Sequence, residues 1–103
     1  MREPVERLKK KVQRENLWLF ILCILSIKEC HGFELRGAVK ERFGFLAGNV
    51  TAYKVLYMLK KGGYVSLRRQ GNIKYYRITE KGRKEIIKAR KFIKDIMREF
   101  GWM

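Results

Sequence analysis

Residues 60–82 read KKGGYVSLRRQGNIKYYRITEKG, and this stretch decides the fold. Two runs of β-forming residues, 64–67 and 73–78, flank the turn-forming residues Gln70, Gly71 and Asn72. Thr79 is of a type that caps helices, so it predicts a helix directly after the second run. The stretch therefore predicts a short β-hairpin that leads into a helix.

The tip of this hairpin is basic. It carries no acidic residue, and the side chains suited to a phosphate backbone or a minor groove are Arg68, Arg69, Asn72 and Lys74. The alternative is an ordinary charged edge, because lysine on an edge strand blocks aggregation. The absence of any acid favours contact with nucleic acid.

Helical patterns precede the hairpin. An apolar run over residues 17–27 predicts a buried central helix, and residues 33–43 predict a second, amphipathic helix. Residues 50–61 predict a third helix that points Tyr53, Leu56 and Leu59 inward, with Asn49 or Gly48 as its cap. This order predicts a mainly α fold with a small β-hairpin, a winged helix-turn-helix plus a long C-terminal dimerisation helix.

In such a fold the helix over residues 50–61 reads the major groove. Asn49 and Thr51 suit hydrogen bonds to base edges or phosphate, and Lys54 and Lys61 suit phosphate. The alternatives are that Asn49 is only a cap, that Lys61 is only a favourable cation at a helix C-terminus, and that the others are solvated surface residues.

Residues 80–100 predict the long helix, and its apolar positions recur at spacings of three and four. Other apolar residues widen this face beyond what one small domain covers. Val5, Leu8 and Val12 predict an amphipathic helix within residues 1–15, which adds a second apolar stripe. We expect a homodimer through Val5, Leu8, Val12, Ile86, Ala89, Ile93, Ile96 and Phe100. The alternative is a helix packed on its own domain. We therefore expect one compact domain in three parts. The N-terminal helix spans residues 1–15, the DNA-binding part spans residues 16–79, and the dimerisation helix spans residues 80–103.

Composition limits the partner and the chemistry. The 103 residues include 25 Lys and Arg against 10 Asp and Glu, a formal charge of +15, which attracts polyanions such as double-stranded DNA.

The spacing of Cys23, Cys30 and His31 fits no common metal site. No nucleophile–base pair or phosphate loop occurs, so neither an enzyme nor a cofactor is expected. Residues 17–27 are shorter than the roughly 20 residues that span a membrane, so we expect a cytoplasmic protein.

Three motifs resemble the PadR-like family of winged-helix transcriptional regulators. They are ILCILSIKECHGFEL (residues 21–35), VTAYKVLYMLKKGGYV (residues 50–65) and KYYRITEKG (residues 74–82), and the likeness runs over residues 19–82. The resemblance implies a homodimer on an inverted-repeat operator, usually a repressor. It also places Thr51 and Tyr53 at the DNA-facing start of the reading helix.

The resemblance further implies an aromatic small-molecule effector at the dimer interface in some members, for which Trp18, Phe100 and Trp102 are the candidate lining residues. The chain departs from the family's Ser-Pro-Gly before the reading helix, where it has Gly48, Asn49 and Val50. Two other functions remain open. The first is an architectural protein that binds any duplex. The second is a subunit that uses the fold to recruit an acidic protein.

Overall fold

The central helix α2 (Leu17–Leu25) is the centre of the computed structural model, which describes residues 3–101. Its apolar side chains are buried along most of its length, and it is in contact with α1, α3, α4, α5 and β3. The core around it is completed by Leu35 and Val39 of α3 (Gly32–Phe43), by Leu56 of α4 (Asn49–Lys61) and by Val65 of β2. The predicted buried helix is therefore confirmed, although it ends at Leu25 and not at residue 27.

Three antiparallel strands form one small sheet in the order β1-β3-β2. Strands β2 (Val65–Gln70) and β3 (Ile73–Ile78) make the predicted hairpin, in which Val65 pairs with Ile78. Gly71 has a φ of +62°, and the following turn residue has a negative φ, the pattern of a type II′ turn. The sequence did not predict β1 (Cys30–His31), which adds two residues to the outer edge of β3.

The junction between α4 and the last helix fixes the base of the hairpin. The Thr79 hydroxyl caps α5 (Glu80–Glu99) by accepting a hydrogen bond from the Gly82 amide at 3.1 Å, which confirms the predicted cap. The same hydroxyl donates to the Gly63 carbonyl at 2.6 Å, and the Lys81 ammonium donates to the Gly62 carbonyl at 2.6 Å. Both bonds tie the end of α4 to the start of α5.

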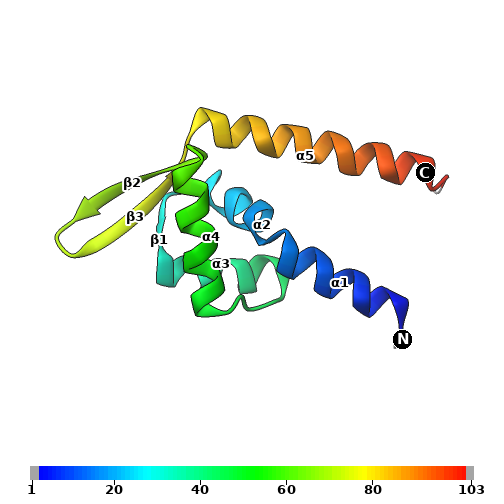
Figure 1. The fold of residues 1–103 in the computed structure, drawn as a ribbon, viewed down its shortest axis with the longest axis horizontal. Helices are drawn as coiled ribbons and strands as arrows, with labels where there is room; N and C mark the ends of the chain where they lie inside the picture. The colour runs from blue at the N-terminus through cyan, green and yellow to red at the C-terminus, as the bar shows by residue number, and fades with distance from the viewer. Residues whose placement is uncertain (1–2, 102–103) are drawn as a thin grey trace.

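The hairpin and the two outer helices lie at opposite ends of the molecule (Figure 1). The hairpin projects from one end, whereas α1 (Pro4–Glu15) and the distal part of α5 extend beyond the core at the other. No residue of α1 is buried, and Gly82 is the one buried residue of α5. No helix within residues 3–101 is long and apolar enough to cross a membrane.

Gly82 marks the closest approach between α5 and the hairpin. A methyl group added there would meet the Tyr64 carbonyl oxygen, so we expect Gly82→Ala to lower the free energy of unfolding by about 2 kcal/mol or more. Gly37→Ala is the control, because the exposed α3 position has nothing within 4 Å of the added methyl group. It should raise stability by about 0.5–1 kcal/mol through helix propensity. Urea denaturation measures both, and equal effects would contradict the packing at Gly82.

Candidate nucleic-acid interface

One strip of α4 points directly away from the core. Ala52, Leu56 and Leu59 are the buried residues of this helix. At 3.6 residues a turn, the opposite side of the helix carries residues spaced by four, three and four. These exposed residues, here called the outward strip, are Val50, Lys54, Tyr57 and Lys61. The strip therefore contains two of the predicted reading residues, Lys54 and Lys61.

The other predicted reading residues flank this strip. Asn49 is exposed, and Gly48 rather than Asn49 occupies the N-cap position. Thr51 lies on the side that faces the α3–α4 connection, where it lines a hollow with Arg14 of α1. Tyr53, predicted to point inward, is 44% exposed because Ala52 takes that position in the core. It packs on the opposite flank of α4, since a methyl group added at Gly32 would lie 2.5 Å from its ring. The structure thus gathers the predicted residues on the outer half of α4 without placing them all in one row.

A hydrogen-bonded turn sets the start of α3 beside this helix. The Glu34 amide donates to Nδ1 of His31 at 3.3 Å, and the His31 amide donates to the Glu34 carboxylate at 3.1 Å. This reciprocal pair is a capping box, and it satisfies two amide groups at the helix N-terminus. His31 therefore has a structural role between β1 and α3.

The basic side chains of the hairpin lie on two faces. Arg69 and Lys74 are cross-strand partners, so their side chains share one face of the tip. Both are exposed, and neither has an acidic side chain within ion-pair distance among residues 3–101. Arg68 lies on the other face, and Asn72 is exposed in the turn. The four residues predicted to form one cluster therefore lie in three places: Arg69 and Lys74 share one face, Asn72 is in the turn, and Arg68 lies on the other face.

Arg68 is held by the protein itself. Its Nη2 lies 2.5 Å from Oε1 of Glu29, its Nε donates to Oε2 of the same carboxylate at 3.4 Å, and its guanidinium lies 4.6 Å from the centre of the Tyr75 ring. Nε of Arg77 approaches the same carboxylate at 3.6 Å. The hydrogen bond from Arg68 is the main reason that the pKa of Glu29 is lowered from 4.5. The pair joins the α2–β1 connection to the hairpin.

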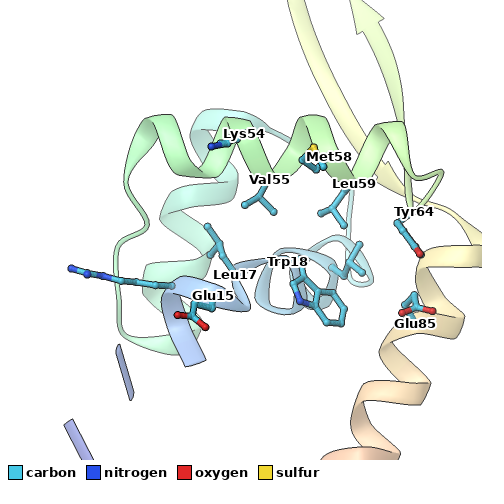
Figure 2. Close-up of a pocket in the computed structure, with 11 residues that line it drawn as sticks. Glu15, Leu17, Trp18, Lys54, Val55, Met58, Leu59, Tyr64 and Glu85 are labelled. Carbon is cyan, nitrogen blue, oxygen red and sulfur yellow. The ribbon is translucent and has the colours of Figure 1, made fainter. Parts of the chain in front are cut away.

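A pocket lies behind α4, between α2, α4 and the start of α5 (Figure 2). Its volume is about 440 Å³, and its floor and walls are mainly apolar, with Trp18, Val55 and Met58 among them. Nε1 of Trp18 donates to the Asn16 side chain at 3.3 Å. Phe100 does not line this pocket, and Trp102 lies outside the described residues. Of the three aromatic residues named from the sequence, the pocket therefore contains Trp18.

The outer helices expose their apolar stripes. Val5, Leu8 and Val12 of α1 are 49%, 62% and 38% exposed, and Ile93 of α5 and Phe100 at its C-cap are 47% and 65% exposed. Ile96 of the same stripe is 37% exposed, and Ile87, Phe92 and Met97 widen the face of α5. Ala89 is half-buried, and Ile86 packs against the core of its own chain. The apolar stripe of α5 is therefore exposed to solvent along the distal part of the helix, and the core of the same chain covers its start.

These elements define a class of protein. A reading helix, a basic two-stranded wing and a long C-terminal helix around one apolar helix make a winged helix-turn-helix DNA-binding protein. The model of the transcriptional regulator PadR-like family matches residues 21–88, more than half of the chain. The protein belongs to this family of DNA-binding transcriptional regulators, as its motifs indicated, and the family is not one of enzymes.

Solved structures agree with this assignment. The PadR family transcription regulator from Clostridium difficile R20291 has 29% identity and a TM-score of 0.69, over 81% of this chain and 95% of that one. The PadR family transcriptional regulator from Eggerthella lenta DSM 2243 has a TM-score of 0.77 at 20% identity, over 94% of this chain and 88% of that one, and so supports the fold. Bacillus subtilis PadR in complex with operator DNA has 28% identity and a TM-score of 0.64, over 71% of this chain and 45% of that one. No match is found among curated proteins.

Glu29 and Arg68 give a pH-dependent contribution to stability. Because the pKa of Glu29 is lowered on folding, the contribution is present above about pH 4.5 and is lost as the pH falls through the lowered pKa. We expect Glu29→Gln to be less stable than the wild type at about pH 6, and this difference to shrink as the pH falls below 4.5 and the Glu29 carboxylate becomes protonated. Urea denaturation across this range measures the difference.

Glu41→Gln is the control, since this exposed carboxylate forms no ion pair with the described residues. A Glu29→Gln difference that stays constant with pH would show that the ion pair contributes nothing.

Proposed function

We propose that this protein is a homodimeric repressor that binds an inverted-repeat operator in the cytoplasm. The observation that carries the proposal is the outer half of α4, which offers exposed lysine, threonine and asparagine side chains beside a basic wing. The residue types match those that contact phosphates and base edges. The similar Bacillus subtilis PadR is described in complex with operator DNA, which supports an operator as the ligand.

In this proposal α4 enters the major groove. Asn49, Thr51 and Tyr53 lie in its N-terminal half, the part of a recognition helix that contacts base edges. Lys54 and Lys61 lie on the outward strip and are placed to neutralise phosphates. The division assigns sequence preference to residues 49–53 and affinity to the two lysines.

The wing contributes affinity. Arg69 and Lys74 share one face of the hairpin tip, with Asn72 in the turn beside them. We assign these three side chains to the DNA backbone. Arg68 is already engaged with Glu29, so its contribution to binding is chiefly to hold the hairpin in place.

The dimer is proposed from the uncovered stripes of α1 and α5. A monomer of this size gains nothing from exposing five large apolar side chains of α5 and the adjacent Phe100 to water, and a second copy of the chain would cover them. Both helices extend from the end of the molecule opposite the wing, so pairing there leaves both wings free for DNA (Figure 1).

An aromatic effector remains a second proposal. The pocket that contains Trp18 lies against the inner side of α4, and its volume is within the range of about 300–1,000 Å³ that small-molecule sites occupy. A molecule bound there would touch Val55 and Met58 and so act on the reading helix directly. Its place is within one chain, next to the outer helices that we assign to the dimer.

The main rival is an architectural protein that binds any duplex, and the formal charge of +15 favours it. Selection from random duplex DNA at physiological salt separates the two. A regulator should enrich a defined site that binds roughly a thousandfold or more tighter than bulk DNA. A ratio near one would establish the architectural function instead.

Substitutions within the same measurement test the division of roles. Arg69→Ala should weaken binding to all duplexes alike and flatten the salt dependence, whereas Thr51→Ala should change the preferred sequence. Arg98→Ala on distal α5 is the control for loss of one positive charge. The division is wrong if Arg69→Ala and Thr51→Ala shift the selected sequences equally.

The dimer is tested by substituting the stripe of α5. Ile93→Asp should convert a dimer into a monomer at micromolar concentration, because it places a carboxylate in an apolar contact. Ile73→Asp is the matched control, since both isoleucines are 47% exposed and Ile73 lies at the tip of the wing. Sedimentation velocity measures the mass, and a wild-type monomer at this concentration would refute the dimer.

A further inference from the structure

Val50 is the most exposed large apolar side chain within residues 3–101, at 82%. It is the second residue of α4, and residues 3–101 leave it almost uncovered. It contributes nothing to the core, because the buried residues of this helix lie on the opposite side. We therefore expect Val50 to function through contact with another molecule.

A second copy of the chain does not suit this position. Val50 belongs to neither of the apolar stripes on α1 and α5. Its neighbours along the outward strip are Lys54, Tyr57 and Lys61, and a second chain with a formal charge of +15 would repel the two lysines. A DNA duplex would attract the two lysines through its phosphates, and it would then also have to contact the valine beside them.

The major groove offers one apolar group to such a side chain. Base edges there carry hydrogen-bond donors and acceptors, and the exception is the C5 methyl group of thymine. A valine in a helix holds almost one rotamer, so little side-chain entropy is lost when it meets that methyl group. Lys54, one turn further along the strip, would lie on the backbone beside the same base pair.

We infer that Val50 selects a thymine in each half-site by contact with its C5 methyl group. This inference rests on the proposed function and adds a residue and a base to it. The sequence prediction passed over Val50 because it is apolar, and only its exposure in the folded protein identifies it as a reader.

The test removes this contact from either side, by taking the methyl group from a thymine or by shortening the Val50 side chain. In the duplex selected by the full-length protein, each thymine of one half-site is replaced in turn by deoxyuridine, and affinity is measured by fluorescence anisotropy. One replacement should weaken wild-type binding roughly fourfold, the effect of one buried methyl group. Val50→Ala should bind the thymine and deoxyuridine duplexes equally.

Ile27→Ala is the matched control. Ile27 is an exposed apolar residue outside α4 and outside both apolar stripes, so its variant should keep the full fourfold difference. A defined site without a sensitive thymine, or a Val50→Ala variant that keeps the difference, would overturn the inference and leave the proposed function standing. A selection that yields no preferred sequence would overturn both.

Discussion

Burial of α2 against its neighbours is the constraint on which the rest of the structure depends. This helix is nine residues of LWLFILCIL, and five of them are buried. With no charged side chain on any face, it can be stable only when other elements cover it all round. The helices α3, α4 and α5 and the strand β3 supply that cover. The orientation of α4, the proposed reading helix, is thus set by α2, which its Leu56 and Leu59 help to bury.

The wing depends on this core through two separate attachments. At its base, Thr79 and Lys81 bond to the carbonyl groups of Gly63 and Gly62, so the end of α4 and the start of α5 hold both strands. Further out, Glu29 joins Arg68 to the segment that follows α2. The hairpin and α4 are therefore both attached to the core, and in the proposed complex one duplex would meet them in a constant geometry.

Local patterns allowed most of the fold to be predicted, because the apolar run, the turn at Gly71 and the cap at Thr79 each act within a few residues. The features that were missed depend on distance along the chain. Glu29 meets Arg68 across 39 residues, and β1 is two residues that form a strand only because β3 lies beside them. The exposure of Val50 likewise follows from which side of α4 the core occupies. The spacing placed Leu56 and Leu59 inward, but it chose Tyr53 rather than Ala52 as the third inward residue and so shifted the predicted face.

In the proposed complex, the charge of the chain would oppose dimerisation and favour DNA binding, and salt would act on the two in opposite directions. Two copies, each with a formal charge of +15, would repel one another, so added salt would screen the repulsion and favour association through the apolar stripes of α1 and α5. The same salt weakens binding to phosphates by reducing the gain from counterion release. A duplex that bridges both wings would itself neutralise part of the repulsion. Dimerisation and operator binding would then be coupled through charge as well as through geometry.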